Sequence, residues 1–114
     1  MRSRGCWNLP YDRRCVLLVM YDLPVKTAAQ RKAAAVFRKY LISDGFQPVQ
    51  ESVYVKLMRN ETGSNADMEA IKNAAPGDGA VNAIVISLSV FLSMRSLRGE
   101  AFEKERFAGD MVMI

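Results

Sequence analysis

An apolar run at residues 15–20 constrains the fold more than any other stretch, because six apolar residues in a row predict a short buried strand. The strand ends in a single carboxylate, Asp22. Pro24 then turns the chain, since proline cannot continue a strand ladder and disfavours a helical predecessor. Thr27 and Gln30 form a capping box, which predicts the start of a helix. We therefore expect Asp22 at the end of a central strand, beside a loop that can carry chemistry.

The helix is predicted over residues 28–43 and has two distinct faces. Its apolar positions follow helical spacing: Ala33, Val36, Phe37, Tyr40 and Leu41. Its basic residues fall on the opposite face: Arg31, Lys32, Arg38 and Lys39. Such a face can be merely solvated. The absence of any acid between Leu23 and Ser43 favours contact with a nucleic acid instead.

Three more extended segments and a second helix complete the pattern. The extended segments are predicted at residues 46–50, 52–58 and 80–88. The second helix is predicted over residues 66–75, with Ser64 or Asn65 as its cap. The near-continuous apolar run at 80–88 predicts a strand that is central or covered on both faces. The order strand–helix–strand–strand–helix–strand indicates an α+β, ferredoxin-like split βαβ fold with both helices on one sheet face.

The other sheet face has no cover from the first 88 residues, which suggests a partner. We interpret residues 1–114 as one domain, with a basic arm at 1–14 and a core at 15–88. The remaining segment, 89–114, ends in a short apolar strand at residues 111–114. Such a tail often pairs with the edge of another chain, so we expect strand exchange in a homodimer.

Composition narrows the location and the chemistry. The sequence has no apolar run long enough to span a membrane and no signal peptide, so we expect a cytoplasmic protein without a membrane partner. It has no histidine, and Cys6 and Cys15 match no zinc pattern. Any hydrolysis must therefore rest on carboxylates, a hard metal ion, tyrosine or lysine.

Charge is unevenly distributed along the chain. Residues 1–45 hold nine basic and three acidic side chains, a net charge of +6, whereas residues 46–114 carry a net charge of −2. One pole of the molecule should therefore be positive, which favours a polyanionic partner such as nucleic acid.

Several short motifs together resemble a known family. They are Met20-Tyr21-Asp22-Leu23-Pro24, Thr27, Gln30-Arg31-Lys32, Phe37-Arg38-Lys39, Leu41, Asp44-Gly45-Phe46, Gln50-x-Ser52-Val53-Tyr54-x-Lys56 and Gly99-Glu100. At these spacings the chain resembles the small CRISPR-associated adaptation proteins, the ferredoxin-like endoribonuclease family that partners the spacer integrase. It looks most similar to the subtype found beside single-protein DNA-cutting effectors.

The resemblance implies a homodimer that helps to capture foreign DNA as spacers. It also implies a metal-dependent endonuclease activity on duplex DNA or single-stranded RNA. In the family, the aspartate at the position of Asp22 binds magnesium opposite its copy across the dimer. Asp22 is thus the candidate catalytic and metal-binding residue, with Mg²⁺ as the cofactor.

The residues alone leave alternatives open. Asp22 could make a local turn bond instead, and Gln50 and Ser52 could either contact phosphate or be ordinary strand-edge residues. Tyr21 and Tyr54 are more typical of core packing than of ligand contact. Three function classes stay open: a bridge holding DNA and two integrase dimers, a metal-dependent endonuclease, and a regulator that binds a small ligand.

Overall fold

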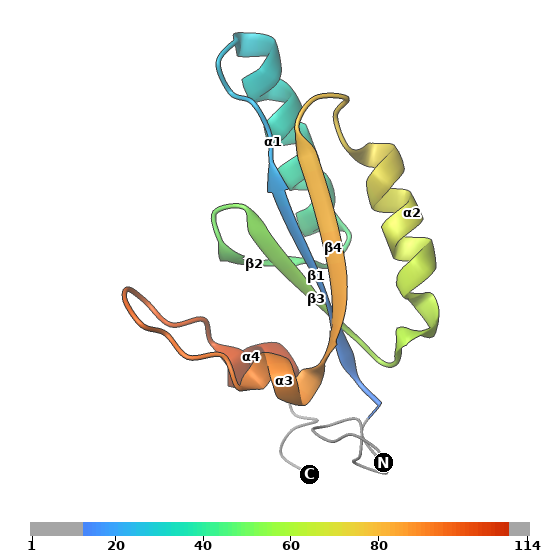
Figure 1. Cartoon of the computed structure of the whole chain (residues 1–114), viewed down its shortest axis with the longest axis vertical. Coiled ribbons are helices and arrows are strands. Elements are labelled where there is room, and N and C mark those ends of the chain that lie inside the picture. The colour runs from blue at the N-terminus through green and yellow to red at the C-terminus, as the bar shows by residue number, and fades with distance from the viewer. Residues whose placement is uncertain (1–12, 110–114) are drawn as a thin grey trace.

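The computed structural model describes residues 13–109 and contains the predicted order of elements (Figure 1). The first six are β1 (Cys15–Asp22), α1 (Ala28–Ser43), β2 (Gln47–Gln50), β3 (Val53–Met58), α2 (Ser64–Ala74) and β4 (Ala80–Ser87). Two short helices follow, α3 (Leu88–Leu92) and α4 (Lys104–Ala108). The predicted ferredoxin-like arrangement is therefore confirmed. The predicted strand at 111–114, Cys6 and most of the N-terminal arm lie outside the described residues.

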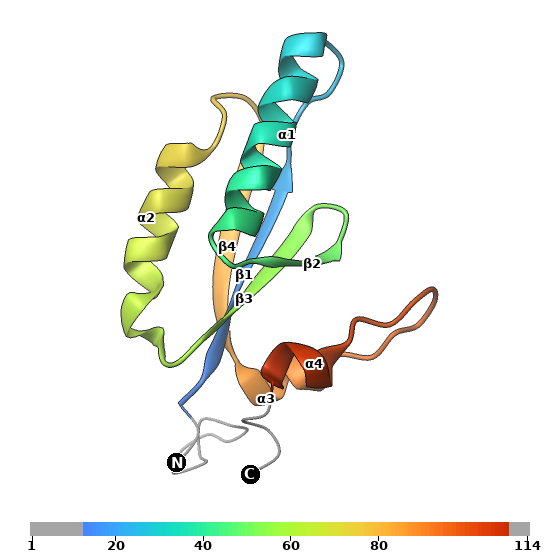
Figure 2. The ribbon, with the colours of Figure 1, turned by 180° about the vertical axis from the view of Figure 1, so that it is seen from behind.

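The four strands form one antiparallel sheet in the order β2-β3-β1-β4. β1 is therefore a central strand, as its apolar run predicts. Helices α1 and α2 both cover the same face of this sheet (Figure 2). The short strand β2 lies at one edge and contains a bulge between Pro48 and Gln50, in agreement with the irregular edge that Pro48 predicts.

The helix-covered face holds the larger core. Leu17, Val19 and Tyr54 from the sheet pack against Phe37 and Leu41 of α1. The capping box at the start of α1 is present as predicted, and the helix has the predicted bounds. Val36 was predicted on the apolar face, but this is wrong: its side chain is 57% exposed. The buried stripe of α1 is thus narrower than the spacing suggests.

The prediction that the strand near residues 80–88 is central or covered on both faces is wrong. β4 is an edge strand, paired only with β1, and Ile84 is 50% exposed. Its apolar residues alternate between the two faces, with Val85 against the helix-side core and Ile86 against the other. The apolar run of β4 therefore reflects partial packing on both faces of the sheet. It does not show that β4 is a central strand.

The cap of α2 also differs from the prediction. Gly63 occupies the N-cap position and makes no side-chain hydrogen bond. Ser64 is buried in the first turn, where its hydroxyl donates to the carbonyl of Glu61 at 2.8 Å. A 3-10 turn at Glu61–Gly63 precedes the helix and is itself capped by Asn60. Ile71 of α2 faces the core as predicted.

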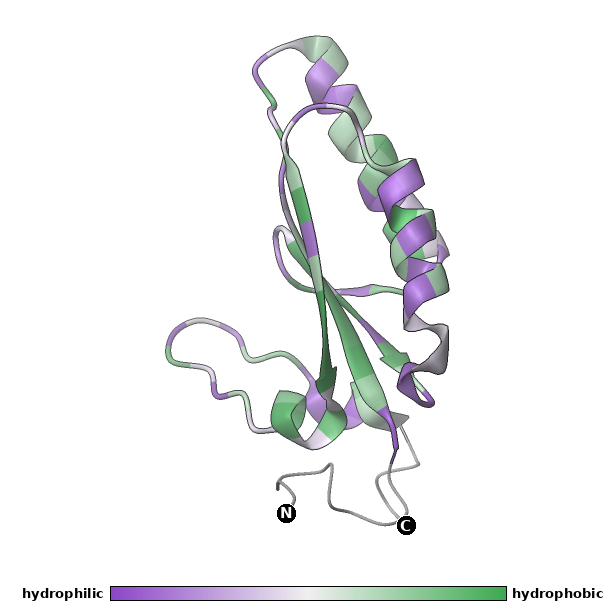
Figure 3. Ribbon diagram, turned by 45° about the vertical axis from the view of Figure 1, so that its right-hand side comes forward, coloured by the Kyte–Doolittle hydropathy of each residue, from purple (hydrophilic) through white to green (hydrophobic). Residues whose placement is uncertain are grey.

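The opposite sheet face is covered over only part of its length. Helices α3 and α4 lie on that side, at one end of the sheet (Figure 3). Phe91 and Phe107 from these helices pack against Val16 and Val55 of the sheet. Residues 88–109 thus fold back on the chain's own sheet as two helices and a loop, where the sequence suggested a segment for strand exchange.

Two further findings concern the cysteine and the helices of the described chain. Cys15 is fully buried at the start of β1. None of the helices within residues 13–109 combines the length and apolar character that crossing a membrane would require.

Candidate functional site

Asp22 is the last residue of β1 and pairs with Ala80 at the start of β4. Gly79 packs closely against the backbone of Asp22, since a Cβ added to this glycine would lie 2.5 Å from the carbonyl oxygen of Asp22. Its φ is +90°, a conformation that favours glycine. The Asp22 side chain is exposed, and its carboxylate makes no hydrogen bond or ion pair with any residue between 13 and 109. Within the described chain, the backbone at Asp22 is therefore fixed while its carboxylate stays available.

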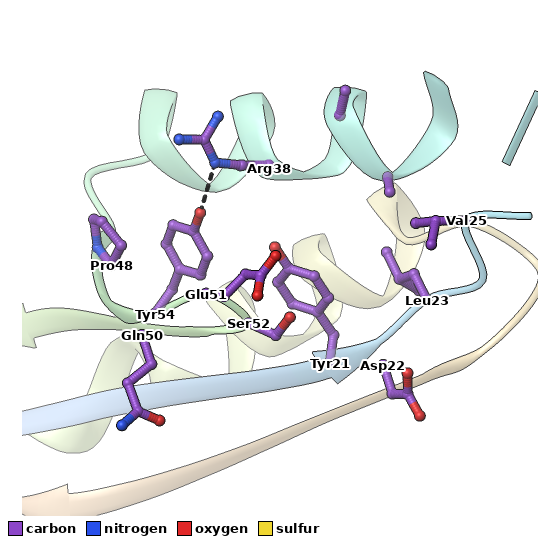
Figure 4. Close-up of a pocket in the computed structure, with 12 residues that line it drawn as sticks. Tyr21, Asp22, Leu23, Val25, Arg38, Pro48, Gln50, Glu51, Ser52 and Tyr54 are labelled. Carbon is purple, nitrogen blue, oxygen red and sulfur yellow. Dashed lines mark hydrogen bonds between the residues drawn. The ribbon is translucent and has the colours of Figure 1, made fainter. Parts of the chain in front are cut away.

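A groove of about 670 Å³ lies between the end of β1, helix α1 and the turn that joins β2 to β3. It is lined by Tyr21, Asp22, Leu23, Val25, Ala34, Ala35, Arg38, Pro48, Gln50, Glu51, Ser52 and Tyr54. The structure thus brings together Asp22, Arg38, Gln50 and Ser52, four of the candidate site residues. Figure 4 shows that the Asp22 carboxylate points away from Arg38 and from the ring of Tyr21.

Arg38 is held in place by a buried tyrosine. Its Nε donates a hydrogen bond of 2.9 Å to the hydroxyl of Tyr54, while the two terminal nitrogens are left without a partner in the described residues (Figure 4). Tyr54 stacks on Tyr21, with ring centroids 6.0 Å apart. The guanidinium is therefore oriented at the groove wall with donors to spare, the arrangement that suits a phosphate.

Burial, with help from the neighbouring Tyr54, raises the pKa of Tyr21 from its ordinary value of 10 to about 12. The Tyr21 phenol is thus neutral at physiological pH and can donate a hydrogen bond, but it cannot act as a base there. This agrees with the interpretation of both tyrosines as packing residues, since Tyr21 and Tyr54 belong to the helix-side core.

The remaining basic residues of α1 differ from one another. The guanidinium of Arg31 donates to the carbonyls of Val25 and Lys26, each at 3.1 Å, and so fixes the loop between β1 and α1. Lys32 and Lys39 are exposed and make no hydrogen bond or ion pair within residues 13–109. None of these three lines the groove. The basic face therefore consists of two engaged arginines and two lysines that are available to a ligand.

The turn between β2 and β3 carries the other groove residues. The carbonyl of Ser52 accepts a 3.1 Å hydrogen bond from the amide of Tyr21, which ties the turn to the end of β1. Gln50 follows the bulge in β2 and is exposed. Glu51 also lines the groove, and our sequence analysis did not select it. Its place in a polar Gln-Glu-Ser turn beside the predicted site was the only signal that could have identified it.

One chain offers only part of a magnesium site. Among residues 13–109, no three metal-ligating side chains of His, Cys, Asp or Glu cluster together. Magnesium prefers oxygen ligands and keeps several waters, so the exposed carboxylate of Asp22 has suitable chemistry. Asp22 therefore supplies one suitable carboxylate, and the other protein ligands of any magnesium ion here would have to come from elsewhere.

Comparisons with known proteins agree with the resemblance that the motifs suggest. The family model described as CRISPR associated protein Cas2 matches residues 15–94. Among curated proteins, a "CRISPR-associated endoribonuclease Cas2" of Streptococcus mutans serotype c (strain NN2025) is 37% identical over 84 residues, which cover 74% of this chain and 78% of the relative.

Two other relatives bear the same name. The one from Acidovorax ebreus (strain TPSY) is 32% identical over 90 residues, covering 79% of this chain and 88% of the relative. The one from Ligilactobacillus salivarius (strain UCC118) is 31% identical over 98 residues, covering 86% and 97%. The family-model match over residues 15–94 includes β1 with Asp22, helix α1 and the turn between β2 and β3. The chain belongs to the CRISPR-associated Cas2 protein family.

Proposed function

We propose that this chain acts in CRISPR adaptation as a homodimer that binds foreign duplex DNA and bridges dimers of the spacer integrase. The observation that carries the proposal is the uncovered end of the second sheet face. Met20 and Ile84 point to that face and are 44% and 50% exposed. Asp22 follows Met20 by two residues, so the alternation of a strand places it on the same face.

An exposed apolar surface beside a carboxylate suits a second copy of the same chain. A two-fold interface pairs each surface patch with its own copy, so both apolar ends would be covered at once. The same operation would bring the two Asp22 carboxylates toward one axis. We propose that this pair completes the oxygen ligand set for Mg²⁺ that a single chain lacks.

Bound magnesium would polarise a phosphodiester and lower the pKa of a bound water. The chain's own contribution is the placement of Asp22, whose backbone is fixed by β4 and by the tight approach of Gly79. Arg38 contributes a held guanidinium for a neighbouring phosphate. Hydrolysis would add water across one phosphodiester bond and cut that strand into two fragments, one ending in a phosphate and the other in a hydroxyl.

The polyanion would be held mainly by charge. Lys32, Lys39 and Arg38 supply donors on α1, and Gln50 and Ser52 add polar groups at the groove. These exposed charged and polar side chains suit phosphate contacts, so we expect binding to be independent of sequence and strongly dependent on salt. The same surface suits duplex DNA and also single-stranded RNA.

A second candidate is a protein whose main role is magnesium-dependent cleavage of RNA or DNA by Asp22 of both subunits. The unpaired Asp22 carboxylate favours it, as does the endoribonuclease name of the relatives. We favour the bridge, because each chain contributes one carboxylate at this site and the sequence has no histidine to serve as a general base.

The test is spacer acquisition in cells by an Asp22→Asn variant, together with cleavage by the purified protein. Asparagine keeps the size of the side chain but removes the charge that holds the ion. We expect cleavage to vanish and acquisition to continue. Asp78→Asn is the matched control, since Asp78 is an exposed aspartate in the turn before β4 and should affect neither activity.

Loss of acquisition in a folded, dimeric, integrase-binding Asp22→Asn protein would reject the bridge and support the enzyme. A wild-type chain that supports no acquisition beside its integrase would also reject the bridge, and a wild-type chain that cleaves neither RNA nor DNA would reject the enzyme.

A further inference from the structure

The loop between Asp22 and helix α1 has little burial of its own. Residues 25–27 are exposed, and residues 23 and 24 are only partly buried. Packing alone therefore does not hold the second half of this loop. An exposed segment keeps one shape only if its backbone groups find hydrogen-bond partners. In the structure, these partners come from side chains near the start of α1.

Arg31 supplies the partner for two loop carbonyls. One of its terminal nitrogens donates to the carbonyl oxygens of Val25 and Lys26, each at 3.1 Å. Helical side chains lean toward the N-terminus of their own helix, so an arginine near the start of α1 can reach back over the preceding loop. Both carbonyls precede the N-cap Thr27, whose own carbonyl accepts the amide of Arg31. Arg31 therefore ties a part of the chain that the helical ladder does not include.

Gln30 supplies the partner for two loop amides. Its side-chain oxygen accepts hydrogen bonds from the amides of Lys26, at 2.9 Å, and Thr27, at 3.0 Å. Its own amide donates to the hydroxyl of Thr27 at 3.1 Å. The side chains of two adjacent helix residues thus bind four backbone groups of the loop. We call Gln30 and Arg31 the loop clamp.

The clamped loop begins directly after Asp22. Its first residue, Leu23, packs against the helix-side core and lies so close to Gly79 that an added Cβ would be 3.0 Å from the leucine side chain. Leu23 and Val25 point toward α1 and line the groove, whereas the Asp22 carboxylate points to the other side (Figure 4). A loop that came free of α1 would therefore loosen the strand end that carries this carboxylate.

We propose that Arg31, together with Gln30, positions the magnesium-binding carboxylate of Asp22, and that Arg31 is not a nucleic-acid contact. The inference rests on the proposed magnesium site and adds the residues that fix its geometry. A carboxylate on a mobile strand end loses freedom when it binds an ion, whereas a carboxylate beside a clamped loop has already lost it. The clamp thus raises the affinity for Mg²⁺ without touching the ion.

The experiment measures magnesium affinity by titration calorimetry and amide hydrogen exchange of the loop, both with the full-length protein. Arg31→Gln removes the donor that reaches the two carbonyls. It should weaken magnesium binding by about fivefold and speed the exchange of the Lys26 and Thr27 amides by a similar factor. Gln30→Ala should weaken magnesium binding to the same extent, although it changes no charge.

Two variants separate positioning from a general loss of stability. Arg31→Lys should recover most of the magnesium affinity, because a single nitrogen makes both hydrogen bonds and an ammonium can also donate to two carbonyls. Ser64→Ala is the matched control. It removes a hydrogen bond to the carbonyl of Glu61 at the start of α2, which follows β3 at the opposite end of the sheet from Asp22. It should leave magnesium affinity unchanged.

The salt dependence of nucleic-acid binding tests the second half of the proposal. Arg31→Gln should keep the wild-type slope of affinity against salt, because its guanidinium is used by the loop. Lys39→Gln is the comparison, since Lys39 is an exposed cation on the same helix, and it should lower the slope by about one unit. A slope lowered by one unit in Arg31→Gln would identify Arg31 as a phosphate contact and overturn its assignment to the loop.

The outcomes for magnesium distinguish this inference from the function on which it rests. If the wild-type protein binds magnesium and Arg31→Gln and Gln30→Ala bind it as tightly, the positioning role is overturned while the magnesium site stands. Weaker binding with unchanged exchange of the loop amides in Arg31→Gln, or no recovery in Arg31→Lys, would also overturn the role. A wild-type protein that binds no magnesium would overturn the proposed site and the role together.

Discussion

The two faces of the sheet differ in how completely the chain covers them. On the helix side, two long helices cover the sheet and a single core runs from Leu17 to Ile71. On the other side, two five-residue helices cover one end and leave Met20 and Ile84 exposed at the end that carries Asp22. The contrast suggests that stability resides mainly on the first face, while the second is left open for partners.

The largest expected effects on the free energy of unfolding come from creating a cavity in the core on each sheet face, and they test whether the two faces differ in stability. Phe37→Ala should lower the free energy of unfolding by about 3–5 kcal/mol, because Phe37 is fully buried among residues of three elements. Phe107→Ala should cost less, since α4 is short and can open locally while the rest stays folded. Urea denaturation of both variants measures the difference. Equal losses would show that the two faces unfold as one equally stabilised unit.

A smaller effect is expected at the turn before β4. Gly79→Ala should destabilise the protein by about 1–3 kcal/mol, because its φ is positive and the added Cβ would press on Asp22 and Leu23. Gly77→Ala is the matched control, since nothing lies within 4 Å of its added Cβ. Thermal unfolding of both variants is the measurement. If the two behaved alike, the backbone at Asp22 would not be tightly held.

The smallest effect concerns Tyr54 on the helix-covered face. Tyr54→Phe removes the acceptor of Arg38 and should cost about 1 kcal/mol. Tyr54 also helps to raise the pKa of Tyr21 to about 12, so the variant should lower that pKa, although burial, the larger cause, remains. Carbon-13 NMR of labelled tyrosine measures the titration. An unchanged Tyr21 pKa would rule out this coupling.

The raised pKa of Tyr21 also determines how the stability of the protein changes with pH. The folded pKa of Tyr21 is raised, so its contribution to stability is fully present below pH 10 and is lost as the pH rises toward about 12. In Tyr54→Phe the pKa of Tyr21 should lie lower, so the pH range over which this stability is lost should end below about 12. Unfolding followed between these pH values should therefore show less alkaline destabilisation attributable to Tyr21 in the variant.

The helix-covered half of the fold was predictable because its signals are local. The apolar run that opens β1, the Thr27–Gln30 box and the helical spacing of Phe37 and Leu41 each fix one element, and together they fix the order. The position of β4 was not predictable in this way. Whether a strand is central depends on its neighbours in space, and the apolar run of β4 reflects partial cover from two sides.

The sequence predicted several of the residues at the candidate site, but it did not predict the contacts that these residues make. The end of β1 and the turn at Ser52 were both selected, and the structure places them around one groove. Helical periodicity placed Arg31 and Arg38 on one basic face of the helix, yet Arg31 binds loop carbonyls and Arg38 binds Tyr54. Those contacts depend on tertiary neighbours that a single helix pattern does not contain. The α3–α4 cover also lacked a local signal, since both helices are only five residues long.

The most direct test of the central claim is the magnesium stoichiometry, measured by isothermal titration calorimetry together with the molar mass in solution. If the open end of the sheet is a two-fold interface that joins two Asp22 carboxylates, the wild-type dimer should bind one ion for every two chains. Ile84→Asp should give a folded monomer without this site, because it places a charge on the exposed apolar end. One ion per chain in a monomer, with Ile84→Asp unchanged, would contradict the account.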